Sequence, residues 1–268
     1  MPLNMKKDSL VNDVLSGRNT QELIEYIKRY GNIAEASTLR KRSLRKGGIK
    51  KGSEKAENVI FFGCMPPFTR PIELRSALNL LDELDIPYTY MDEEYCCGSP
   101  VEENAEGENN PTAVAASREF ATLNMSRVKE LGAKNIVYCC IWCAYMGKKY
   151  HDVSDISQKY LLDIVLENVI DKPLQVSPQT IGYYEGCHSR NRHFAPGIEL
   201  DWKSYRNALD RIKGLKVIEL NSKVCCAVRP QRVIAQAREL GVDSIVCSCT
   251  NCYVRLSNIS PAGLPVRE

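Results

Sequence analysis

The sequence lacks an apolar run long enough to cross a bilayer, and its first residues lack the apolar core of a secretion signal. These absences predict a cytoplasmic protein without a transmembrane segment. In that reducing compartment, paired cysteines are more often metal ligands or redox thiols than the structural disulfides of an exported protein. The ferredoxin run C-x-x-C-x-x-C-x-x-x-C-P is also missing, so the sequence does not predict an ordinary cubane electron-transfer cluster.

A charge excess of one sign is confined to the N-terminal part of the chain. The net charge is only +3, but residues 1–57 carry 13 Lys and Arg against 7 Asp and Glu. Most of the excess lies in the stretch from Arg40 to Lys55, RKRSLRKGGIKKGSEK, which is typical of a solvated linker or a docking arm for an acidic partner. No nucleic-acid-binding motif accompanies it, so the sequence does not predict a nucleic-acid partner.

The strongest signal is the arrangement of cysteine. Cys96 and Cys97 are adjacent, and neighbouring cysteines are strained partners for a disulfide, whereas they can hold one metal cluster from two sides. A lone cysteine precedes the pair and a C-x-x-C follows it, and the same series occurs again later in the chain. Ten of the twelve cysteines thus form two equal sets: Cys64, Cys96, Cys97, Cys140 and Cys143; and Cys187, Cys225, Cys226, Cys249 and Cys252.

In the first set, Cys64, the adjacent pair and Cys140 each follow a predicted strand. Apolar stretches predict strands at 58–63, 86–91 and 135–138, and helical periodicity predicts helices at 71–84 and 111–131. Strands that alternate with helices indicate a parallel α/β sheet, which holds its sites beyond the carboxyl ends of the strands.

Two further helices are predicted outside this alternation. Residues 20–30 form the first, with Thr20 as its cap and Gly31 at its end, and its apolar face must pack on the body of the protein or on a partner. Residues 154–170 form the second, an amphipathic helix that joins the two halves of the chain.

The pattern then starts again. Strands at 180–185 and 216–220 flank a helix near 202–212, and residues 240–246 match 131–137 almost position for position. The predicted fold class is therefore α/β, with two pseudo-repeated Rossmann-like lobes that have parallel sheets, plus a helical N-terminal extension. The predicted domains are 1–57 (basic helical extension and linker), 58–153 (first cysteine-bearing domain), 154–178 (connecting helix) and 179–268 (second cysteine-bearing domain).

The two repeats are unequal after the adjacent cysteines. The first has 42 residues between that pair and the C-x-x-C, and the second has 22. Gly98, which follows the first pair, is replaced by Ala227 in the second. The second site is therefore expected to be more open. Cys139 and Cys247 have no cysteine opposite them in the other repeat, so neither is predicted as a ligand.

Several chemistries could use such sets. Tetrahedral zinc needs four ligands, usually as two C-x-x-C pairs, whereas an iron–sulfur cluster with several irons can employ five thiolates. A thioredoxin-like redox pair would explain Cys140 and Cys143 but would leave the other thiols without a role. A zinc-stapled interaction protein is the alternative outside redox chemistry.

A lone cysteine, then Cys-Cys-Gly, a spacer and C-x-x-C resembles the CCG or cysteine-rich domain family. Two such patterns in one short chain resemble the B subunit of heterodisulfide reductase. The resemblance covers roughly residues 58–258. It implies that Cys64, Cys96, Cys97, Cys140 and Cys143 hold one noncubane [4Fe-4S] cluster, and that Cys187, Cys225, Cys226, Cys249 and Cys252 hold a second.

The same resemblance implies an oxidoreductase that acts on a sulfur group. In that family two clusters facing one another split a disulfide, such as the heterodisulfide of coenzyme M and coenzyme B. Another small-molecule or carrier-bound thiol or disulfide is an alternative substrate. The expected partners are an iron–sulfur C subunit, which donates electrons, and a flavin-containing A subunit. The second candidate function is an electron-transfer subunit of a complex that oxidises a 2-hydroxy acid or glycerol 3-phosphate, although such subunits usually carry ferredoxin motifs.

Four residues are predicted around the substrate or behind the ligands: Gly98, His188, Arg190 and Arg229. His188 follows Cys187 in a Gly-Cys-His that resembles the family's second-repeat signature, and it could hydrogen-bond a sulfide or a substrate thiolate. Arg190, Arg192 and Arg229 would suit an anionic thiol or a carboxylate-bearing carrier at a site between the clusters. The alternative is that these cations only solubilise a loop.

Overall fold

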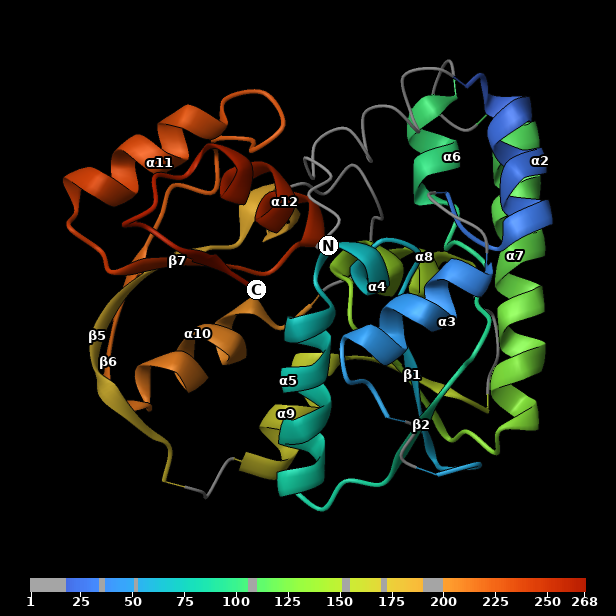
Figure 1. The fold of residues 1–268 in the computed structure, drawn as a ribbon, viewed down its shortest axis with the longest axis horizontal. Coiled ribbons are helices and arrows are strands. Elements are labelled where there is room, and N and C mark those ends of the chain that lie inside the picture. The colour runs from blue at the N-terminus through green and yellow to red at the C-terminus, as the bar shows by residue number, and fades with distance from the viewer. Residues whose placement is uncertain are drawn as a thin grey trace. The chain divides into compact units, whose positions relative to one another are not determined.

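The computed structural model describes residues 18–33, 37–50, 53–105, 110–150, 155–169, 173–189 and 200–268. The chain divides into two compact units, Met1–Leu161 and Leu162–Glu268. Each unit is built around its own parallel sheet covered by helices (Figure 1). In the described ranges, no helix is both long and apolar enough to span a bilayer.

The first unit has a four-stranded sheet. Its strands are β1 (Asn58–Phe61), β2 (Tyr88–Tyr90), β3 (Asn135–Tyr138) and β4 (Ser157–Tyr160), in the order β2-β1-β3-β4. All three strand pairs are parallel, and β1, β2 and β3 are buried along almost their whole length, as expected for a sheet covered on both faces. The strands predicted at 58–63, 86–91 and 135–138 are confirmed within two residues at each end.

Helices connect these strands along the first unit. They are α4 (Pro66–Thr69), α5 (Pro71–Glu83), α6 (Ser99–Asn104), α7 (Pro111–Glu130) and α8 (Ile141–Tyr150). Proline lies in the first turn of α5 and of α7, where its missing N–H has no intrahelical partner to lose. Both helices were predicted, and α6 adds a short helix directly after Gly98.

The N-terminal helix α2 (Thr20–Tyr30) packs on the first unit. Asn19, rather than Thr20, caps it, and Asn19 and Glu22 form a reciprocal capping box. Leu23, Ile24 and Ile27 belong to an apolar cluster that also contains Cys64, Cys96 and Phe120. Figure 1 shows α2 beside α6 and α7, which it contacts. The apolar face of this helix therefore packs on the body of the protein.

The basic stretch is a helix rather than a linker over its first half. Helix α3 (Ser37–Lys46) turns Arg40 and Leu44 inward, one turn apart, and leaves Arg42, Arg45 and Lys46 less buried. The linker prediction is wrong here because Arg40 has a buried partner in the first unit, which sequence charge alone does not reveal. The first half of the basic stretch is thus part of the unit that carries the first cysteine set.

The second unit repeats the topology of the first. Its strands are β5 (Gln175–Tyr184), β6 (Lys213–Glu219), β7 (Ser244–Cys247) and β8 (Val266–Arg267). They form a sheet in the order β6-β5-β7-β8, and its three strand pairs are also parallel. The helices are α9 (Leu161–Val169), the 3₁₀ turn η1 (Gly186–Ser189), α10 (Trp202–Asp210), α11 (Pro230–Glu239) and α12 (Thr250–Ile259). The predicted α/β class with two parallel sheets is confirmed.

The helix predicted over 154–170 begins later than expected. Residues Ser157–Tyr160 form β4, which pairs with β3 and completes the first sheet, and only Leu161–Val169 is helical. Residues 151–154 lie outside the described ranges. The prediction is wrong at 157–160 because these four residues are largely polar, and a strand at the edge of a sheet needs little apolar character.

We expect Ile27→Ala to lower the free energy of unfolding by about 2–5 kcal/mol, because Ile27 is fully buried in the cluster that includes Cys64 and Cys96. Glu25→Ala, on the exposed side of the same helix, is the matched control and should change it by at most about 0.5 kcal/mol. Denaturant unfolding followed by circular dichroism measures both. Equal effects of the two changes would show that α2 does not pack on the unit.

Candidate functional site

The five cysteines of the first set meet at one edge of the first sheet. Cys64 follows β1, Cys96 and Cys97 follow β2, and Cys140 follows β3, with Cys143 in the first turn of α8. The Sγ atoms of Cys96 and Cys64 are 3.6 Å apart. Cys97 is hydrogen-bonded to Cys96 and Cys143, and Cys143 to Cys140. The structure therefore gathers all five thiols into one continuous group.

The second set gathers in the same way at the edge of the second sheet. The Sγ atoms of Cys226 and Cys252 are 3.2 Å apart, and Cys252 is also hydrogen-bonded to Cys249. Cys187 lies near enough to Cys249, Cys225 and Cys226 for their charges to raise its pKa. Two separate all-sulfur sets thus occupy equivalent positions in two units of equal topology.

The thiols of each set perturb one another. Hydrogen bonding to Cys64 and burial raise the pKa of Cys96 well above its ordinary value, whereas hydrogen bonds with Cys143 and Cys96 hold the pKa of Cys97 well below it. Hydrogen bonding to Cys140 raises the pKa of Cys143, and burial raises the pKa of Cys187 to about 12. A cation that binds these sulfurs as thiolates must therefore displace protons.

The donor chemistry suits a soft metal group. Thiolates favour iron–sulfur clusters and zinc among biological metal centres. Within the described ranges, no three His, Cys, Asp or Glu side chains surround a single metal-ion position. In the first set, neighbouring sulfurs contact one another in sequence from Cys64 to Cys140, so these residues fit a group that meets them at several points.

Accessibility differs between the sets. In the first set only Cys97 is partly exposed, whereas in the second both Cys187 and Cys225 are. Ala227 is exposed directly after Cys226. Residues 190–199, which follow η1, lie outside the described ranges, so the more open second site stays a prediction.

The sequence analysis did not assign a role to the glycine that precedes each lone cysteine. Gly63 and Gly186 have φ values of 86° and 70°, in the left-handed region that side chains rarely adopt. A Cβ added to Gly63 would lie 3.0 Å from the Sγ of Cys143, and one added to Gly186 would lie 3.1 Å from the Sγ of Cys252. The repeated dipeptide Gly-Cys in the two halves was the signal that could have revealed them.

Gly98 has a backbone role in the first site. Its φ is 91°, and a Cβ there would lie 2.2 Å from the Oγ of Ser117 on α7. The glycine thus lets the long helix approach the turn that follows Cys97. Its predicted contact with a substrate stays a prediction.

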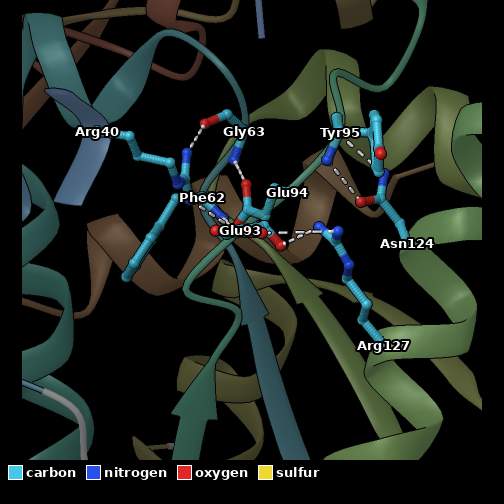
Figure 2. Close-up of polar contacts among 8 residues, drawn as sticks. All are labelled: Arg40, Phe62, Gly63, Glu93, Glu94, Tyr95, Asn124 and Arg127. Carbon is cyan, nitrogen blue, oxygen red and sulfur yellow. Dashed lines mark hydrogen bonds and ion pairs between the residues drawn. The ribbon is translucent and has the colours of Figure 1, made fainter. Parts of the chain in front are cut away.

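A buried ion pair joins two cysteine-bearing segments of the first unit. Figure 2 shows Glu94 accepting the N–H groups of Phe62 and Gly63, at 2.9 and 2.8 Å. Arg40 lies 2.9 Å from a carboxylate oxygen of Glu94 and donates to the carbonyl of Gly63 at 2.9 Å. The two side chains are only 2% and 1% exposed. Burial raises the pKa of Glu94, while Arg40 and the two N–H groups oppose that shift.

Further contacts fix the segment between β2 and the adjacent cysteines. Asn124 on α7 bonds both backbone groups of Tyr95, at 2.8 and 2.9 Å, and Arg127 donates to the carbonyl of Glu93 at 2.9 Å (Figure 2). The N–H of Cys96 donates to the carbonyl of Gly31, just after α2, at 2.6 Å. Residues from α3 and α7, and the end of α2, therefore hold this segment from different sides.

A buried tyrosine borders each set. Tyr138 lies near Cys97 and Cys143 and donates to Gln158 at 3.1 Å. Tyr184 lies near Cys252 and donates to the carbonyl of Val224. Burial raises the pKa of both phenols, so they stay protonated hydrogen-bond donors.

The cysteines not predicted as ligands have other contacts. Cys247 is buried at the end of β7 and donates to the carbonyl of Arg267 at 3.3 Å. The carbonyl of Cys139 accepts from the buried Arg70 at 2.8 Å.

Among the residues of the predicted cationic group, Arg229 is the one whose backbone and side chain both lie in the described ranges. It is exposed just before α11, and its N–H donates to the carbonyl of Cys225 at 2.9 Å. Arg190 and Arg192 lie outside the described ranges, as does the side chain of His188, whose backbone belongs to η1.

Comparison with known proteins agrees with the cysteine pattern. Residues 59–146 match the cysteine-rich domain (CCG) family. The chain is 26% identical over 239 residues to the D subunit of the dihydromethanophenazine:CoB–CoM heterodisulfide reductase of Methanosarcina barkeri, and the match covers 78% of the chain and 55% of that protein. The chain is 27% identical over 184 residues to the same subunit of Methanosarcina acetivorans, and this match covers 64% of the chain and 42% of that protein.

The chain spans about half the length of these curated relatives. Among solved structures, an aspartate racemase homologue from Pyrococcus horikoshii OT3 is 9% identical and has a TM-score of 0.34, covering 80% of this chain and 93% of that one. A likeness of that size carries no inference about activity.

Gly63→Ala is expected to disturb the first thiol set and Gly186→Ala the second, because each methyl would combine a left-handed backbone with contact on a cysteine sulfur of its set. Gly241→Ala is the matched control, since its φ is 62° but nothing lies within 4 Å of the added Cβ. All three should carry about 1–2 kcal/mol of backbone strain.

Of the three variants, only Gly63→Ala and Gly186→Ala should also speed alkylation of the cysteines in their own unit. Mass-spectrometric mapping of alkylated thiols in the metal-free protein measures this. A pattern identical to that of Gly241→Ala would contradict the contact between each glycine and its sulfur.

Proposed function

We propose that this chain is the catalytic iron–sulfur subunit of a heterodisulfide-reductase-like complex. In this proposal the chain would hold two noncubane [4Fe-4S] clusters, and the chemistry they would supply is the reduction or formation of a disulfide. The observation that carries the proposal is the gathering of ten thiols into two sets of five at equivalent edges of two sheets. The similarity over 78% of the chain to a protein of heterodisulfide reductase supports it.

The ligands in this proposal are the two predicted sets of cysteines. When bound, such clusters would pass on the two electrons that a disulfide needs, delivered by the electron donor named below. Together with two protons, these electrons would break the S–S bond and give two thiols. Burial of Cys96, Cys249 and Cys252 keeps water from most of each ligand set. Tyr138 and Tyr184 present neutral phenols beside the sulfurs, where they add no competing negative charge.

A substrate would reach the chain where ligands are exposed. Arg229 places an exposed guanidinium three residues after Cys226, close in the chain to the partly exposed Cys225. This cation suits a substrate with an anionic thiolate or carboxylate. The coenzyme M and coenzyme B heterodisulfide, or another small-molecule or carrier-bound disulfide, fits this description.

The proposed partners are an electron donor like the iron–sulfur C subunit of heterodisulfide reductase, and a flavin-containing protein like its A subunit. Support comes from the relatives, which are named as parts of a reductase with several subunits. Those relatives carry the name of the D subunit, so the likeness to the B subunit is proposed from the cysteine pattern alone.

Protein purified without oxygen should hold about eight irons and as many sulfides, as two four-iron clusters require. Cys97→Ser and Cys226→Ser should each remove roughly half of the iron, because each lies in a different set. Cys247→Ser, whose thiol bonds a backbone carbonyl, is the control and should keep the full content. Iron and sulfide analysis decides, and stoichiometric zinc without sulfide would refute the proposal.

Arg229→Ala should weaken the apparent affinity for the disulfide while the cluster spectra stay unchanged. The assay measures disulfide reduction with an artificial electron donor. Arg232→Ala, also exposed and in the first turn of α11, is the matched control. Identical kinetics for both variants and the wild type would place Arg229 away from the substrate.

A further inference from the structure

We infer that Arg40 and Glu94 are positioning residues of the first thiol set. Helix α3, which carries Arg40, is therefore a structural part of that site. Arg40 lies outside residues 59–146, the segment that matches the cysteine-rich domain. The inference rests on the proposed function only for the identity of the bound group. The positioning itself is a property of the metal-free chain.

Glu94 fixes the turn that carries Cys64. Its two carboxylate oxygens accept the N–H groups of two consecutive residues, Phe62 and Gly63. Such a two-point grip sets the orientation of the two peptide planes before Gly63, just ahead of Cys64. Glu94 also lies two residues before Cys96 in the chain. One side chain therefore couples the position of the lone cysteine to that of the adjacent pair.

Arg40 holds this arrangement from a third segment. One guanidinium nitrogen contacts Glu94, and another donates to the carbonyl of Gly63. The planar guanidinium makes both contacts at once, which a lysine ammonium at the end of a flexible stem does less well. Gly63 is thus held at its N–H by Glu94 and at its carbonyl by Arg40. This matters because Gly63 is the residue whose missing Cβ leaves room for the Sγ of Cys143.

Stability alone does not account for a buried pair of this kind. Removing two charges from water costs free energy that their attraction offsets only in part, and breaking such a pair leaves a buried charge without compensation. Here the hydrogen bonds of the pair to the backbone fall on the segment that leads into Cys64. The chain also offers a neighbouring pair, Lys41 and Glu93, with a separation of 3.0 Å but with both side chains about half exposed.

The second unit differs at the position of Glu94. Lys223 stands two residues before Cys225, where the first unit has Glu94 before Cys96. There the phenol of Tyr184 bonds the carbonyl of Val224. The ion pair of Glu185 with Arg206 leaves the arginine side chain 32% exposed, unlike Arg40. The second thiol set is thus an internal control within the same molecule.

The test compares Glu94→Gln and Arg40→Met with Lys41→Met and Glu93→Gln, which change the exposed pair. In the metal-free full chain, thiols are alkylated with iodoacetamide and mapped by mass spectrometry. We expect the first two variants to raise alkylation of Cys64 and Cys96 about tenfold, because loss of a charged hydrogen bond favours local opening. Cys226 and Cys252 should keep their wild-type rates.

Arg40→Lys keeps the charge and should restore protection in part. Arg40→Met could unfold the whole chain, and alkylation of Cys226 and Cys252 would then rise as well. In that case the comparison of Arg40→Lys and Glu94→Gln with the wild type decides whether the pair positions the thiols. Wild-type alkylation of Cys64 and Cys96 in folded Glu94→Gln and Arg40→Lys would overturn the inference. So would an equal rise in the two exposed-pair variants.

A second readout uses the loaded protein in a Cys226→Ser background, where only the first set remains complete. Glu94→Gln should change the electron paramagnetic resonance signature or lower the iron content, and Glu93→Gln should not. A wild-type signature together with a wild-type iron content in Glu94→Gln would overturn the inference. If the wild-type chain takes up no iron, the proposed function fails, while the alkylation result still decides whether Arg40 and Glu94 position the thiols.

Discussion

The first unit depends on two charges that have been taken out of water. A buried Arg40 needs an acidic partner and a buried Glu94 needs donors, and each supplies what the other lacks. The remaining hydrogen bonds of the pair go to the backbone of Phe62 and Gly63. The ion pair therefore also constrains the backbone conformation next to Cys64. Helix α3 cannot leave the unit without depriving a buried carboxylate of its cation.

Much of the fold was readable from the sequence, because apolar strands and helical periodicity are local signals. The strands at β1, β2 and β3 and the helices α2, α5 and α7 follow from runs of residues that no distant contact needs to explain. The two cysteine sets were also readable, because strand ends in a parallel sheet share one edge. Assigning the cap of α2 to Thr20 rather than Asn19 was an error of one residue within a correct helix.

The features that the sequence could not predict depend on contacts between distant segments. Arg40 looks like any other cation of the basic stretch until Glu94 is seen beside it. The polar strand β4 exists because β3 offers it an edge, not because its own sequence favours a strand. Gly63 and Gly186 were readable in principle, since both halves place glycine before the lone cysteine, but their role emerges only when the sulfurs of Cys143 and Cys252 lie against them.

The two units share the placement of their thiols but not what surrounds them. A buried tyrosine borders each set, but a buried ion pair and helices α2, α3 and α7 lie near the first, whereas the second has a shorter connection between the adjacent cysteines and the C-x-x-C. The charges and hydrogen bonds around thiolate ligands tune the electronic properties of what they hold. Equal ligand sets in unequal surroundings would therefore give the proposed clusters different potentials. A reaction that moves two electrons in separate steps can use such a difference, because each electron would then pass through its own cluster.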